Sequence, residues 1–148
     1  TLKVDPDAVL LPDRARSQLR PYSVFPSKPY YVRNCNKPIV AGGEPVAAMY
    51  GATEAFSRGV LDLYYAPGAA ADCKTSLNWT HWGEDLFMSM CLEHLSLVAH
   101  RGSVTLDLWH FLGDVRCLGA NCRDPLAASF HAFKSIAAWF QCHDLATG

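Results

Sequence analysis

The first acidic residues of the chain have the types and the spacing of a site for a hard divalent cation. Asp5 and Asp7 flank Pro6 in the segment KVDPDAVLLPDR, residues 3–14. Carboxylate oxygens suit Mg²⁺ and Mn²⁺, so an Asp-x-Asp pair can gather such an ion. Asp and Pro also favour turns, and a turn without any ligand would use the same residues. The segment alone leaves both interpretations open.

A second acidic pair, Glu84 and Asp85, opens an apolar helical pattern over residues 83–95. Asp85, Ser89 and Glu93 recur every four residues and form one narrow polar stripe, which predicts a largely buried helix. Acids in a first turn are favoured by the helix dipole alone. A carboxylate mounted on the rim of a rigid helix can also serve as a general base.

Two further residues are candidates, each with a structural alternative. His131 follows Phe130 and could be a metal ligand or an ordinary core or surface histidine. Trp82, just ahead of the second acidic pair, could offer a stacking face to a sugar or pack in the core. No Ser/His/Asp or Cys/His arrangement in the chain indicates a covalent intermediate.

The predicted elements place the first acidic pair at the end of a strand. Residues 2–5 are predicted to be a short strand, and Pro12 begins a helix that covers residues 12–19. Ligands bind at the carboxyl ends of strands in open α/β sheets. Ser57 is the expected N-cap of a helix over 58–65, while residues 66–82 are expected to be a loop. Other strands are predicted near 30–34, 103–110 and 128–131, and a last helix near 134–142; residues 46–56 fit either a strand or a helix.

Composition favours one folded α/β domain with mixed strands. The chain has 148 residues, half of them hydrophobic, and a formal net charge of −1. That length and apolar content allow a real core. The charge balance gives no reason to expect nucleic acid or an anionic membrane as a partner. No apolar run approaches the roughly eighteen residues of a transmembrane helix.

Six cysteines and an Asn-Trp-Thr sequon at residues 78–80 favour the secretory pathway. Six cysteines allow fifteen full pairings, and the sequence does not choose among them. Cys117 and Cys122 are close enough in sequence to close a small disulfide loop. Cys91 lies in the apolar helical pattern and could be a buried free thiol.

Four segments resemble, in the same order, those of the inverting β-1,3-glycosyltransferases and their Fringe-like relatives. They are LKVDPDAVLLPDRARSQL, MYGATEAFSRGVLDLYY, GEDLFMSMCLEHLSL and SFHAFKS. The resemblance implies a GT-A fold, of which this chain would be the carboxyl-terminal portion, with a mixed sheet flanked by helices. Residues 1–148 are then expected to be a single catalytic domain without its amino-terminal nucleotide-binding half, and the resemblance leaves open whether the chain alone is active.

The resemblance also implies a location in the Golgi or ER lumen, with membrane attachment only through an anchor upstream of this chain. The donor would be a nucleotide-sugar, usually UDP-linked, and the acceptor a hydroxyl of a glycan or glycoprotein. Mn²⁺, or Mg²⁺, would be the cofactor.

Carried onto this sequence, the resemblance makes Asp7 and His131 metal ligands, Asp5 a partner toward the nucleotide ribose or the metal, and Asp85 the catalytic base. We expect Glu84 and Trp82 to contact substrate. Pro6 departs from the family, which often has another Asp there, and proline fixes φ and removes an N–H. The alternative function is that of a non-catalytic glycosyltransferase-like fragment or a secreted domain that binds carbohydrate or protein.

Overall fold

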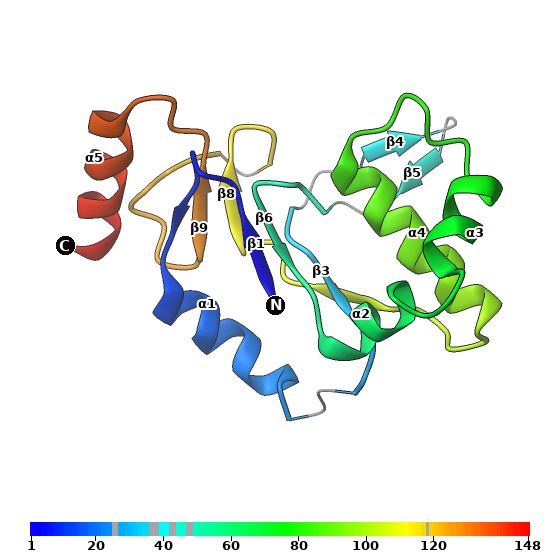
Figure 1. The fold of residues 1–148 in the computed structure, drawn as a ribbon. Coiled ribbons are helices and arrows are strands. Elements are labelled where there is room, and N and C mark those ends of the chain that lie inside the picture. The colour runs from blue at the N-terminus through cyan, green and yellow to red at the C-terminus, as the bar shows by residue number, and fades with distance from the viewer. Residues whose placement is uncertain (25–26, 36–38, 42–43, 47–48, 118) are drawn as a thin grey trace.

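Helices and short strands alternate along the chain, which confirms the expected mixed α/β class (Figure 1). The computed structural model describes residues 1–24, 27–35, 39–41, 44–46, 49–117 and 119–148. The strands are β1 (Leu2–Val4), β2 (Val9–Leu10), β3 (Tyr31–Arg33), β4 (Ile39–Ala41), β5 (Glu44–Val46), β6 (Thr53–Ala55), β7 (Thr105–Asp107), β8 (Leu112–Asp114) and β9 (Ser129–His131). The helices are α1 (Pro12–Leu19), the 3₁₀ turn η1 (Arg20–Tyr22), α2 (Arg58–Tyr64), α3 (Ala69–Ser76), α4 (Glu84–Val98) and α5 (Ile136–Thr147).

The described strands form several small sheets rather than one large one. The sheet that bears on the site has the order β2-β9-β8, with β9 antiparallel to β2 and parallel to β8. β1 pairs with β6, β3 with β7, and β4 with β5. A bridge between Tyr31 and Phe56 links β3 to the end of β6. Mixed pairing was expected, whereas the division into small sheets was not.

Three helices begin where their sequence signals place them. Pro12 occupies the first turn of α1, as the fixed φ of proline favours. Ser57 caps α2 by accepting the Val60 N–H, and Ser135 caps α5 in the same way from Ala138. Each cap satisfies a backbone donor that the helix itself leaves unpaired.

The loop predicted over residues 66–82 is wrong in part, because α3 forms within it. Gly68 adopts a left-handed φ of 82° and turns the chain into the helix. Three alanines follow, which are strong helix formers. Cys73 of α3 is bonded to Cys91 of α4, so this short helix is fixed to a longer one.

Buried apolar side chains form several clusters, of which two lie at opposite ends of the molecule. At one end α5 packs on β2 and β9 around Val9, Phe130 and Cys142. At the other, α2 and α4 pack on β3 around Tyr31 and Leu92. Figure 1 shows α5 and α4 on opposite sides, with β1, β6, β8 and β9 between them. The candidate residues lie along this middle region.

The cysteines form three disulfides, Cys35–Cys117, Cys73–Cys91 and Cys122–Cys142. A small loop closed by Cys117 and Cys122 is therefore wrong, and Cys91 is not a free thiol. Three disulfides indicate an oxidising environment, secreted or lumenal. In the part of the chain that the structure describes, no helix combines the length and the apolar character needed to cross a bilayer.

Candidate metal centre

The segment from Asp5 to Ala8 forms a turn and also gathers carboxylates. The Ala8 N–H donates to the Asp5 carbonyl at 3.0 Å, which closes the turn around Pro6. The Asp5 N–H donates to the Ala52 carbonyl at 3.0 Å, which anchors the turn just beyond β1. The turn interpretation of the sequence is thus correct, and it does not exclude the metal interpretation.

The pairing of β2 with β9 brings the two ends of the chain together at this turn. Val9 lies opposite Phe130 in the register, so His131 is placed beside Asp7. His131 Nε2 is 3.5 Å from Asp7 Oδ1. One ligand atom from each of Asp5, Asp7 and His131 lies within 4.8 Å of the others. Two carboxylates and an imidazole in this arrangement could hold a divalent cation such as Mn²⁺.

Asp114 orients His131 from the other side, and sequence reasoning missed it. The parallel register of β8 and β9 sets Asp114 opposite His131, and His131 Nδ1 is 2.6 Å from Asp114 Oδ2. Gly113 permits this close pairing, because a Cβ there would meet the Phe130 ring at 2.8 Å. A carboxylate on the second ring nitrogen fixes the tautomer and the direction of a metal-binding histidine.

The Asp114 side chain is only 1% exposed, and it is held as an anion. Burial by itself would raise the pKa of Asp114. Hydrogen bonds from the Arg116 side chain and backbone and from His131 outweigh burial and lower that pKa to about 2. The carboxylate is therefore charged at neutral pH and attracts a proton to His131 Nδ1, which leaves the lone pair of Nε2 available to a cation.

Lys134 also reaches the centre. Its Nζ forms an ion pair with Asp7 Oδ2, although its side chain is 80% exposed. This hydrogen bond, with lesser contributions from the charges of His131 and Lys134, lowers the pKa of Asp7. A cation bound by Asp7 would release the lysine, whose long flexible stem could then carry its charge to an anionic ligand.

Asp85 is held firmly at the start of α4. Its Oδ2 accepts the Gly51 N–H at 3.0 Å and its Oδ1 accepts the Leu86 N–H at 2.8 Å. The buried side chain of Asn34 fixes the Gly51 loop through hydrogen bonds to the backbone of Tyr50 and Thr53. The carboxylate is half-buried and its position is set by the backbone.

Arg116 lies between Asp85 and the acidic cluster. It bonds Asp114 through Nε and Nη2, and its guanidinium stacks 4.7 Å from the centre of the Tyr50 ring. Asp114 raises the pKa of Arg116 most, and the charge of Asp85 contributes as well. We call the succession Asp85, Arg116, Asp114, His131, Asp7 and Lys134 the polar row.

Glu84 and Trp82, which were expected to contact substrate, are not members of the polar row. Glu84 forms an ion pair with Lys3 at 2.5 Å, and Lys3 also binds Glu54 at 2.8 Å. Lys3 thus ties the strand that leads to Asp5 to the helix that begins with Asp85. Trp82 is half-buried in the turn before α4, where its N–H donates to the Trp79 carbonyl at 2.9 Å.

Glu54 is a second residue that sequence reasoning did not select. Its side chain is 1% exposed. Among the described residues none makes a hydrogen bond to its buried Oε2. Burial, with the nearby charge of Glu84, outweighs the effect of Lys3 and raises the pKa of Glu54 to about 7.

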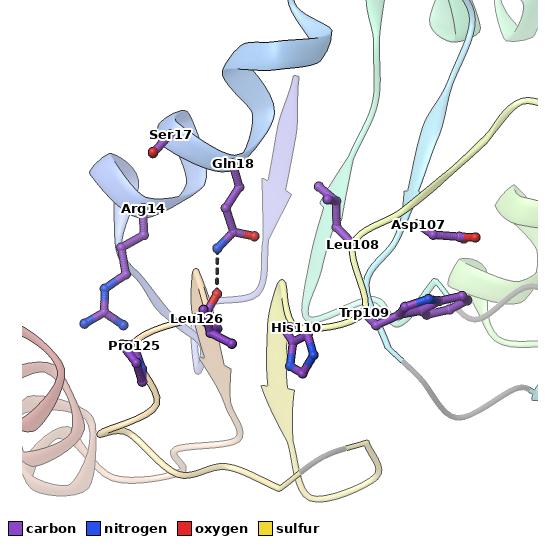
Figure 2. A pocket seen from close by; sticks show the side chains of 9 residues that line it. All are labelled: Arg14, Ser17, Gln18, Asp107, Leu108, Trp109, His110, Pro125 and Leu126. Carbon is purple, nitrogen blue, oxygen red and sulfur yellow. Dashed lines mark hydrogen bonds between the residues drawn. The ribbon is translucent and has the colours of Figure 1, made fainter.

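A separate hollow of about 440 Å³ opens between α1, the residues after β7 and those before β9 (Figure 2). Its His110 precedes β8 and its Leu126 precedes β9, whereas Asp114 and His131 end the same strands. Gln18 donates to the Leu126 carbonyl at 2.6 Å, and Arg14 donates to backbone carbonyls around it. These polar groups fasten α1 to its neighbours, and the hollow is not part of the polar row.

Comparison of the chain with protein-family models, curated proteins and solved structures found no match.

Proposed function

We propose that this chain belongs to a metal-dependent inverting glycosyltransferase of GT-A type. It would move a sugar from a nucleotide-sugar, most simply a UDP-sugar, to a hydroxyl of a glycan or glycoprotein in the Golgi or ER lumen. One observation carries the proposal: Asp5, Asp7 and His131 converge from distant parts of the chain within 4.8 Å. The disulfides agree with a lumenal location.

The donor set fits Mn²⁺ or Mg²⁺. Asp7 and His131 would hold the cation with Asp5 beside them, and Asp114 would keep His131 Nε2 directed at it. Three protein ligands leave coordination positions for phosphate oxygens. When bound, such a cation neutralises the charge that develops on a departing diphosphate.

The remaining steps fall to side chains of this chain. Asp85 would accept the proton of the acceptor hydroxyl while that oxygen forms a bond to the anomeric carbon. The bond from that carbon to the phosphate oxygen breaks on the opposite side, so one displacement inverts the configuration. Lys134 would leave Asp7 and pair with the diphosphate that carries the bonding electrons away.

A transfer assay tests this function. The chain is incubated with Mn²⁺, a panel of UDP-sugars and simple glycoside acceptors, and product is followed by mass spectrometry. Asp85→Asn should reduce transfer by at least about 10²-fold, because general-base loss has that effect. Asp13→Asn, which changes an exposed acid of α1, is the matched control and should retain the wild-type rate. An Asp85→Asn variant as fast as wild type would contradict the assignment of Asp85 as the general base.

A non-catalytic binding domain is the second candidate, and one observation favours it. Lys134 forms an ion pair with Asp7, and both Asp85 oxygens accept hydrogen bonds from backbone N–H groups. These carboxylates therefore already have partners within the chain. In that case nucleotide-sugar or glycan would bind without product formation, and Asp85→Asn would leave binding unchanged.

A further inference from the structure

The connection between α3 and α4, residues 77–83, carries the Asn-Trp-Thr sequon on the surface of the molecule. Asn78, Trp79 and Thr80 are all exposed, and none of them belongs to a helix or a strand. Thr80 and His81 form a turn between the two helices. An acceptor asparagine needs a surface loop of this kind, because the glycan that it receives is bulky and solvated.

The two side chains that the sequon requires are free in the fold. Neither the Asn78 amide nor the Thr80 hydroxyl makes a hydrogen bond to any residue that the structure describes. The asparagines at 34 and 121 differ, since Asn34 donates to the Tyr50 carbonyl and Asn121 Oδ1 accepts the Arg123 N–H. A glycan on Asn78 would therefore break no side-chain hydrogen bond among the described residues, and the fold loses nothing by accepting it.

Other residues hold the backbone that carries Asn78. The Leu77 N–H donates to the Cys73 carbonyl at 3.0 Å. Trp79 Nε1 donates to the Lys74 carbonyl at 3.0 Å, and the Trp79 ring meets the Phe87 ring with centres 5.8 Å apart. The connection therefore keeps its conformation without any contribution from the Asn78 side chain.

The disulfides place the chain in a compartment where this modification occurs. The Cys73–Cys91 bond joins the two helices on either side of the sequon, and two further bonds form elsewhere. Disulfides persist in secreted proteins and in the ER lumen, and Asn-x-Thr sequons become glycosylated in secreted proteins. The middle residue of this sequon is Trp79, so the proline that would block transfer is not there.

We propose that Asn78 carries an N-linked glycan, received from a lipid-linked oligosaccharide diphosphate. Asn78 Nδ2 loses a proton to a base of the transferring enzyme and forms a bond to the anomeric carbon of the first sugar. The bond from that carbon to the phosphate oxygen breaks, and the lipid diphosphate leaves with the bonding electrons. This modification does not depend on the proposed transferase activity, so a failed sugar-transfer assay would leave it standing.

Expression of the full chain in cultured animal cells, behind a signal peptide, tests the modification. Peptide N-glycosidase should lower the apparent mass of wild type, and peptide mass spectrometry should find Asn78 converted to Asp by the enzyme. Asn78→Gln and Thr80→Ala should each lose the whole mass shift, because one removes the acceptor nitrogen and the other the hydroxyl that the sequon requires. Medium and cell lysate are both analysed, so that a variant retained by the cell is still measured.

Thr75→Ala is the matched control, because Thr75 is an exposed threonine of α3 outside the sequon. It should keep the full mass shift. A count of free thiols identifies the chains that have formed their disulfides and have thus reached an oxidising compartment. Disulfide-bonded wild type whose mass the glycosidase leaves unchanged would overturn the inference, and so would a mass shift that persists in Asn78→Gln.

Discussion

Asp114 is the residue on which the geometry of His131 depends most directly. Its buried carboxylate accepts a hydrogen bond from Arg116 and pairs with His131 Nδ1. Sequence alone gave no reason to select it, because the Gly-Asp of β8 resembles many loop sequences and only the parallel register with β9 sets it beside His131. Sequence reasoning missed Lys134 as well, because its partner Asp7 lies near the opposite end of the sequence.

Replacement of Asp114 by Asn should destabilise the protein in a pH-dependent way. At pH 7 the free energy of unfolding should fall by about 3 kcal/mol, because Arg116 and His131 lose a buried anionic partner. The folded pKa of Asp114 is about 2 against an ordinary 3.8. Its contribution is therefore present above pH 4 and is lost as pH falls toward 2. Urea unfolding of both proteins should show the difference shrinking over that range; a difference independent of pH would contradict the account.

The contribution of Glu54 to the free energy of unfolding should depend on pH in the opposite direction. Its folded pKa is raised to about 7 from an ordinary 4.5, so the folded state keeps a proton that the unfolded state releases. Wild type should lose about 3 kcal/mol relative to Glu54→Gln as pH rises from 4.5 to 8. The measurement is urea unfolding at several pH values in that window. Parallel stability curves for the two proteins would show that folding does not raise the pKa of Glu54.

At the scale of elements, local signals predicted more than long-range ones could. Pro12, Ser57 and the apolar pattern of α4 predicted where those helices lie, because caps and periodicity act within a few residues. The loop prediction over 66–82 failed at α3, since Pro67 and Gly68 signal a turn while the alanines just after them favour a helix. Disulfide pairing could not be predicted, because it depends on which elements pack together.

Removal of the Cys73–Cys91 disulfide tests how far α3 depends on α4. The bond spans 18 residues, and closure of such a loop stabilises a fold by about 3 kcal/mol. The double variant Cys73→Ala with Cys91→Ala should lose about that amount and should show faster amide hydrogen exchange in α3. The matched control replaces Cys122 and Cys142, whose bond spans 20 residues, and should speed exchange in α5 instead. Equal exchange in both helices of both variants would contradict the assignment of each bond to its own helix.

At the scale of the whole molecule, the two ends of the chain meet in the middle of the fold. β2 near the amino terminus pairs with β9 near the carboxyl terminus, while α5 and α4 cover opposite sides. The metal hypothesis drawn from the sequence required this meeting, and a resemblance over four ordered segments suggested it. Composition and periodicity could not have done so, because they do not relate residues more than a hundred positions apart. Arg116 and Asp114, which connect the cluster to Asp85, follow from the same tertiary arrangement.

The coupling between Mn²⁺ and nucleotide tests the central claim most directly. Calorimetric titration of UDP with and without Mn²⁺ should show Mn²⁺ strengthening nucleotide binding at least about 10-fold in wild type, since a hard cation held by few protein ligands completes its shell with phosphate oxygens. Asp7→Ala and His131→Ala should each remove most of that coupling, while Asp13→Ala should keep it. Coupling in the Asp7→Ala variant as strong as in wild type would contradict the account and leave the Asp-Pro-Asp segment as a turn.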